Sequence, residues 1–99
     1  MNDTTVLKKE LQKIPNVGPA IAQDLVLLGV KEVSQLAGMD PDDMYDRLCQ
    51  ISGSRQDPCV WDTFAAVVDY AKRGEPKPWW SFTAERKKRW AEQGRGKQS

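Results

Sequence analysis

Residues 14–19, IPNVGP, have the residue types that a phosphate-binding turn needs. Pro19 suits the first position of a helix, and the N-terminus of a helix leaves several backbone N–H groups without intrahelical partners. These groups point toward any anion that approaches. Asn16 is the best non-glycine choice for a left-handed backbone, and Gly18 has no side chain to keep a phosphate away. The turn therefore predicts a phosphate site that does not read sequence.

A second interpretation is that the turn only reverses the chain between two core helices. On both sides of it, apolar residues recur at spacings of three and four. This spacing predicts helices over about residues 4–14 and 19–28, the first closed by Pro15 and the second capped by Gly29. A helix, a tight turn with glycine and a second helix that opens on proline form the helix-hairpin-helix pattern.

The following elements are also predicted to be helices. Residues 31–38, KEVSQLAG, predict a brief helix that ends at Gly38. Asp-Pro pairs then open two longer helices, over about residues 40–52 and 57–74, because aspartate caps a helix and proline fits its first position. Two further prolines precede a short last helix with a polar tail. No strand pattern occurs, so we expect an all-α fold of five or six short helices.

The segment LAGMDP, residues 36–41, resembles a second hairpin turn. It has Asp40 where a phosphate-binding turn has glycine, and a carboxylate would repel a phosphate. We therefore expect tandem, SAM-like helix-hairpin-helix units, the first intact and the second degenerate and structural. Residues 1–74 would form this domain, and residues 75–99 a basic C-terminal extension that contains proline and tryptophan.

The extension carries a local positive charge, although the net charge of the chain is only +1. Residues 72–99 contain nine Lys and Arg against three Glu, interleaved with four aromatic residues. Basic groups follow a phosphate backbone and aromatic rings stack on unpaired bases, so this composition fits single-stranded or junction DNA. Alternatively, Trp79 and Trp80 cover an open end of the helical bundle. The candidate phosphate contacts here are Arg86, Lys87, Lys88 and Arg89.

Composition excludes several function classes. A chain of 99 residues forms one small core, and the absence of histidine leaves neither a usual zinc site nor a His-based catalytic site. We therefore expect no enzyme, no metal and no cofactor. Neither a membrane span nor a signal peptide is evident, so a cytoplasmic protein is expected. Cys49 and Cys59 are interpreted as small buried hydrophobes, with a redox-linked pair as the alternative.

Four segments resemble one particular family: IPNVGPAIAQDL, LAGMDPDDMYDRLC, DPCVWDTF and YAKRGEPKPWW. The chain is similar to small bacterial helix-hairpin-helix proteins known as probable pathogenicity-locus proteins, some of which carry a mitomycin-resistance label. The resemblance implies a link to DNA repair or damage resistance. It also implies that a phosphate is held by the backbone amides of Asn16, Gly18, Ala20 and Ile21.

In related hairpins, carbonyls of the turn can coordinate a monovalent cation, which here would involve Gln12, Ile14 and Val17. One departure concerns the positions after the hairpin that often carry Lys or Arg in DNA-binding relatives. Here they hold Gln23 and Asp24.

We therefore predict a monomeric, non-enzymatic module that binds DNA without sequence specificity. Binding would use the hairpin amides, assisted by Lys13 and the basic C-terminal segment, and would weaken as salt is added. The alternative is a protein-interaction adaptor that uses the same fold without nucleic acid. Its contact would be made by the acidic first sixty residues or by the aromatic end.

Overall fold

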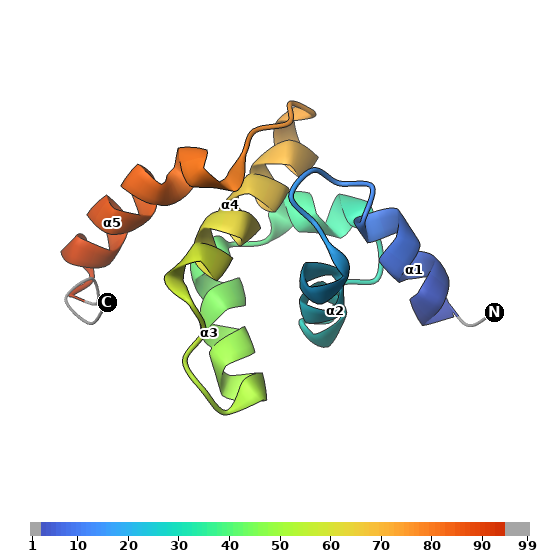
Figure 1. Cartoon of the computed structure of the whole chain (residues 1–99), viewed down its shortest axis with the longest axis horizontal. Helices are drawn as coiled ribbons and strands as arrows, with labels where there is room; N and C mark the ends of the chain where they lie inside the picture. The colour runs from blue at the N-terminus through green and yellow to red at the C-terminus, as the bar shows by residue number, and fades with distance from the viewer. Residues whose placement is uncertain (1–2, 95–99) are drawn as a thin grey trace.

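The computed structural model describes residues 3–94, and all regular structure in this range is helical (Figure 1). This confirms the predicted all-α class. There are five α-helices and two short 3₁₀ helices within the described range: α1 (Asp3–Leu11), α2 (Pro19–Leu27), η1 (Val33–Gly38), α3 (Pro41–Ser52), α4 (Pro58–Arg73), η2 (Trp79–Phe82) and α5 (Thr83–Glu92).

The predicted starts and ends of the two longest helices are confirmed. The carboxylates of Asp40 and Asp57 each accept a hydrogen bond from the backbone N–H two residues later, at the N-termini of α3 and α4. Both helices end at glycines in the left-handed conformation, Gly53 with φ of 73° and Gly74 with φ of 74°. These local signals define the helix boundaries because each satisfies backbone groups that the helix itself leaves unpaired.

Helix α1 ends at Leu11, three residues before the predicted end at residue 14. The amides of Lys13 and Ile14 bond to the carbonyls three residues back, so the chain leaves the helix through tight turns. Pro15 limits the helix further because the residue before a proline avoids the α region. The apolar positions that predict this helix are Val6, Leu7, Leu11 and Ile14, and the prediction of an inward-facing side chain is wrong for Val6, which is 46% exposed.

Helix α4 runs through the middle of the molecule, with α1 and α2 on one side and α5 on the other (Figure 1). Its residues Phe64, Val67 and Val68 belong to the main core, which also includes buried residues of α1, α2, η1 and α3. Its residues Trp61 and Ala65 belong to a second cluster, together with Tyr45 of α3 and Trp90 of α5. The rings of Tyr45 and Trp90 lie 5.1 Å apart. Helix α4 therefore joins the hairpin side of the protein to the C-terminal side.

A fully buried carboxylate on α4 holds α5 in place. Asp62 accepts a hydrogen bond from the Thr83 hydroxyl at 2.8 Å and forms an ion pair with Arg86, whose Nε lies 2.8 Å away. The Arg86 side chain is only 12% exposed, and its guanidinium lies 5.3 Å from the centre of the Trp90 ring. A buried charge is costly without a partner, so Asp62 requires α5 to be docked.

The far end of α5 is tied to the start of α3 through Asp42. This carboxylate accepts hydrogen bonds from the Trp61 indole at 2.7 Å and from the Gln93 amide at 2.9 Å. Arg89 lies 3.6 Å from the same carboxylate and 5.3 Å from the centre of the Trp61 ring. Polar contacts thus fix both ends of α5.

The variant Asp62→Ala should destabilise the protein by about 3 kcal/mol, because it leaves the buried Arg86 guanidinium without its counter-charge. Urea unfolding of the full chain measures this change. The control Glu10→Ala removes the exposed ion pair with Lys13 and should change stability by less than about 0.5 kcal/mol. Equal effects of the two variants would show that the buried pair does not fix α5.

Candidate functional site

The turn between α1 and α2, residues 12–18, is called the first hairpin below. Asn16 has a φ of 75°, which confirms the predicted left-handed conformation. Gly18 is the N-cap of α2 in an extended conformation, with φ of −97° and ψ of −174°, and Pro19 occupies the first helical position. The residues that the sequence predicted for a tight turn into a helix therefore have those roles.

The N-terminus of α2 carries donors that the protein does not use. No side chain caps this helix, and its first turn contains no acidic residue. The positive end of the helix dipole is therefore not compensated by the chain itself. Four backbone N–H groups in and after the turn have no acceptor within the described residues, namely those of Asn16, Gly18, Ala20 and Ile21.

Gly18 has open space where a side chain would lie. A Cβ atom at this position would meet no other atom within 4 Å. Its φ is also negative, so neither the backbone conformation nor internal packing requires glycine here. The missing side chain instead leaves room for an external group to approach the backbone.

The carbonyls that the resemblance implies for a monovalent cation lie in the same turn. The Ile14 carbonyl already accepts the N–H of Val17 at 3.1 Å. A carbonyl oxygen has two lone pairs, so this bond is compatible with a cation ligand. The cation site stays a prediction.

The side chain of Asn16 connects the first hairpin to the C-terminal extension. Its Nδ2 donates to the carbonyl of Lys77 at 2.7 Å, and its Oδ1 accepts the N–H of Trp79 at 3.2 Å. One residue thus shapes the turn with its backbone and fixes residues 77–79 with its amide group. Only the role in the turn is predicted by the sequence, because the bonds to Lys77 and Trp79 join residues far apart in the chain.

The two adjacent tryptophans differ in exposure. Trp79 is half-buried, whereas Trp80 is 64% exposed, and their rings lie edge to face at 5.7 Å. The predicted covering role is therefore wrong for Trp80. An aromatic ring presented to solvent beside a basic helix is available for an external contact.

The predicted basic contacts fall into two groups. Arg86 and Arg89 are engaged with carboxylates of the protein, Arg86 with Asp62 and Arg89 with Glu85 at 3.0 Å. Lys87 and Lys88 lie exposed on α5. Lys13 is also largely exposed, with its ammonium 3.1 Å from the Glu10 carboxylate.

The second hairpin has the geometry expected of a structural turn. The Asp40 carboxylate accepts the amide N–H of Asp42 at 3.1 Å, at the N-terminus of α3. The protein's own carboxylate thus occupies the place where an anion would bind. This contact gives a physical reason why an anion is less favoured at the second hairpin than at the first.

The two cysteines are free and half-buried, and they line separate hollows of the surface. Burial raises the pKa of the Cys59 thiol, and the nearby Asp57 carboxylate raises it further. The Asp57 pKa is itself lowered, chiefly by the hydrogen bond from the Cys59 amide. A thiol with a raised pKa stays protonated at neutral pH and is a weak nucleophile. The site thus offers no activated cysteine at this position.

Within residues 3–94, no group of three or more acidic or cysteine side chains is placed to hold a metal ion. No helix in this range is long and apolar enough to cross a membrane.

Comparison with known proteins shows the family. The family described as "Pathogenicity locus" matches residues 4–88. The chain is also 38% identical over 85 residues to the mitomycin resistance protein McrB of Streptomyces lavendulae. The aligned region covers 86% of this chain and 81% of that protein. The chain belongs to the pathogenicity-locus family. No solved structure matches this pathogenicity-locus protein significantly. The family match includes both the first hairpin and residues 77–79, so the Asn16 contacts lie inside it.

Replacing Asn16 should loosen the C-terminal extension of this pathogenicity-locus protein. Asn16→Gly keeps the left-handed turn but removes two hydrogen bonds, so we expect a loss of about 1–2 kcal/mol and faster hydrogen exchange at the Trp79 amide. Asn16→Ala should cost about 1 kcal/mol more because alanine is strained at positive φ. The control Gln12→Ala, exposed in the same turn, should leave exchange at Trp79 unchanged. Unaltered exchange in Asn16→Gly would contradict the connecting role.

Proposed function

We propose that this pathogenicity-locus protein is a non-enzymatic module that binds the phosphate backbone of DNA without reading its sequence. The observation that carries the proposal is that no side chain of the protein caps the N-terminus of α2. The amides of Gly18, Ala20 and Ile21 there have no acceptor within the described residues, and open space lies where a side chain on Gly18 would be. Backbone N–H groups at a helix N-terminus suit a phosphodiester oxygen in both geometry and charge.

Basic side chains would add sequence-independent attraction to this site. Lys13 lies in the first hairpin itself, and Lys87 and Lys88 are exposed on α5. We assign the phosphate contacts of the C-terminal segment to these two lysines. Arg86 and Arg89 would act indirectly, by holding α5 through Asp62 and Glu85.

The exposed Trp80 would supply a stacking contact for an unpaired base. The backbone N–H of Trp79 donates to the Asn16 side chain. This bond holds the segment with the two tryptophans next to the first hairpin, so a stacked base and a bound phosphate could belong to the same DNA molecule. Base stacking on an aromatic ring tolerates every sequence. DNA that contains unpaired bases, such as single-stranded or branched DNA, is therefore the ligand that fits best.

The biological role that we propose is resistance to DNA damage. Its support is the relative from Streptomyces lavendulae, which is named a mitomycin resistance protein. DNA binding would connect this module to damaged or processed DNA in the cytoplasm, as a monomer. Occupation of the same surface by a protein partner is the alternative that the following experiments distinguish.

Gly18→Ala should weaken DNA binding at least about tenfold without lowering the stability of the fold. The added methyl group lies where a phosphate would approach, but it meets no atom of the protein itself. Fluorescence anisotropy of labelled single-stranded, duplex and branched DNA measures the affinity, and thermal unfolding checks the fold.

Gly38→Ala is the matched control. Gly38 also lacks a positive φ and has no neighbour within 4 Å of a built Cβ, but it lies beside the degenerate second hairpin. It should leave DNA affinity unchanged. Equal affinities of Gly18→Ala and wild type would remove the first hairpin from the mechanism. Absence of DNA binding by the wild type at low salt would favour the protein-adaptor alternative.

The double variant Lys87→Gln/Lys88→Gln should lower the salt dependence of DNA binding by about two in the slope of log K against log salt, because each phosphate contact contributes about one. Titration of duplex DNA at several salt concentrations gives this slope. The control Lys31→Gln changes an exposed lysine that lies before η1. A slope unchanged by the double variant would show that α5 does not contact phosphates.

A further inference from the structure

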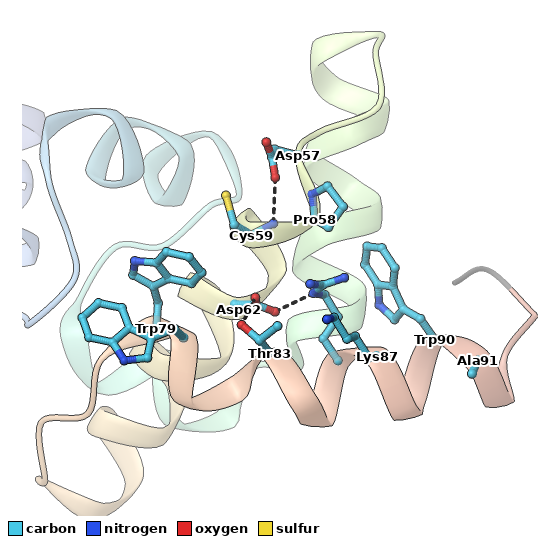
Figure 2. A pocket seen from close by; sticks show the side chains of 11 residues that line it. Asp57, Pro58, Cys59, Asp62, Trp79, Thr83, Lys87, Trp90 and Ala91 are labelled. Atoms are coloured by element: carbon cyan, nitrogen blue, oxygen red, sulfur yellow. Dashed lines mark hydrogen bonds and ion pairs between the residues drawn. The ribbon is translucent and has the colours of Figure 1, made fainter. Parts of the chain in front are cut away.

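A groove of about 750 Å³ lies between the N-terminus of α4 and the segment formed by η2 and α5. Figure 2 shows Trp79 at one end of it and Trp90 at the other, with Asp57 and Cys59 on the α4 side. Its volume is within the usual range for small-molecule sites. Its lining includes Asp57, Asp62, Trp79, Trp80, Arg86 and Lys87.

Indole rings form a large part of the groove wall. Trp80 is 64% exposed and lies edge to face with Trp79, so it can shift over a flat ligand at little cost to the core. Indole rings are electron-rich and have a negative face. They therefore favour a planar ring that is poor in electrons.

Hydrogen-bond donors lie beside these rings. Arg86 uses its Nε for Asp62, and its terminal N–H groups have no hydrogen-bond acceptor within the described residues. The ammonium group of Lys87 is exposed on the same side of α5. These donors can bind carbonyl oxygens of a ligand.

The charges that line the groove balance. Asp57 and Asp62 carry negative charges, and Arg86 and Lys87 carry positive ones. The Asp57 carboxylate faces the groove, where it would repel a phosphate group. A neutral ligand is therefore favoured over a nucleotide.

We propose that this groove is a binding site for an uncharged, planar, electron-poor ring with carbonyl oxygens, that is, a quinone. The ring stacks on Trp80 and Trp79, and its carbonyl oxygens accept hydrogen bonds from Arg86 and Lys87. The groove does not include the amides of the first hairpin, so quinone binding does not require DNA binding there. It does share Trp80 and Lys87 with the DNA contacts proposed above, so a quinone and an unpaired base would compete for this surface.

The first test uses duroquinone, an uncharged quinone whose ring positions are all substituted, which limits addition of thiols. It is titrated into the full ¹⁵N-labelled chain, and the indole N–H signals of the four tryptophans are followed by NMR. The signals of Trp79 and Trp80 should shift and saturate. The signal of Trp61, which is bonded to Asp42, should not shift. Mitomycin C, a larger uncharged quinone, is titrated in parallel.

Trp80→Ala should weaken duroquinone binding about tenfold, and Trp80→Phe should restore most of the affinity. The matched control is Ile51→Ala, which changes another exposed apolar residue, 49% exposed and outside the groove. It should bind like the wild type. Durohydroquinone, the electron-rich reduced form, should bind several-fold more weakly.

The proposal is overturned if no signal shifts saturably, if Trp80→Ala and Ile51→Ala bind equally, or if the reduced form binds as well as the quinone. Tighter binding of thymidine than of duroquinone, measured by the same Trp79 and Trp80 signals, would identify the groove as a nucleobase site and would also overturn it. Anisotropy with Gly18→Ala tests DNA binding on its own. Failure of DNA binding with saturable duroquinone shifts would leave the groove proposal standing.

Discussion

The buried carboxylate of Asp62 determines the arrangement of the C-terminal half of the protein, because a charge in the core of a small domain must be matched by partners in fixed positions. Thr83 and Arg86 supply these partners, one at the start of α5 and the other one turn later. Their spacing sets the direction of α5 across α4. The arrangement also brings η2 and α5 over the N-terminus of α4, which creates the groove. An apolar residue at position 62 would remove the polar contacts at the start of α5 and leave its docking to the Trp90 cluster and to the Asp42 contacts at its far end.

Asn16 has a corresponding role at the other end of the extension. A glycine would form the same left-handed turn with less strain, but it could not bond to Lys77 and Trp79. The use of asparagine thus couples the conformation of the first hairpin to the position of the two tryptophans. The Asn16 side chain bonds to the extension, whereas the turn amides of Asn16 and Gly18 have no acceptor within the described residues, so the contact with the C-terminal segment does not use these amides.

The sequence predicts most of the helices because their boundaries depend on local interactions. The Asp-Pro starts at residues 40 and 57 and the glycine ends at residues 53 and 74 act within one helical turn. The left-handed conformation of Asn16 is local in the same way. The roles of Asp62 and of the Asn16 side chain were missed because their partners lie more than twenty residues away. One signal was present for Asp62, since it interrupts an otherwise apolar stretch of α4 with a charge.

Partners that are distant in the sequence also affect the candidate site, because they determine how much of its basic charge is available to a ligand. From composition alone, every lysine and arginine after residue 71 would be assigned to a surface that binds nucleic acid. In the described part of the chain, Arg73 and Lys77 lie near the Asp69 carboxylate at 2.8 and 3.7 Å, and Arg86 is buried against Asp62. These charges are partly neutralised before any ligand arrives, and the desolvation of Arg86 has already been offset by its own partner.

Within the described part of the extension, the electrostatic contribution is therefore smaller than the composition suggests, and the lysines of α5 are its exposed charges. Surface charges of this kind are screened by salt within about 10 Å at 0.1 M ionic strength. Directional hydrogen bonds from the α2 amides depend less on long-range attraction, since they act only at contact. If DNA is the ligand, the first hairpin must then define where the phosphate lies, and the lysines chiefly increase the rate and strength of the encounter.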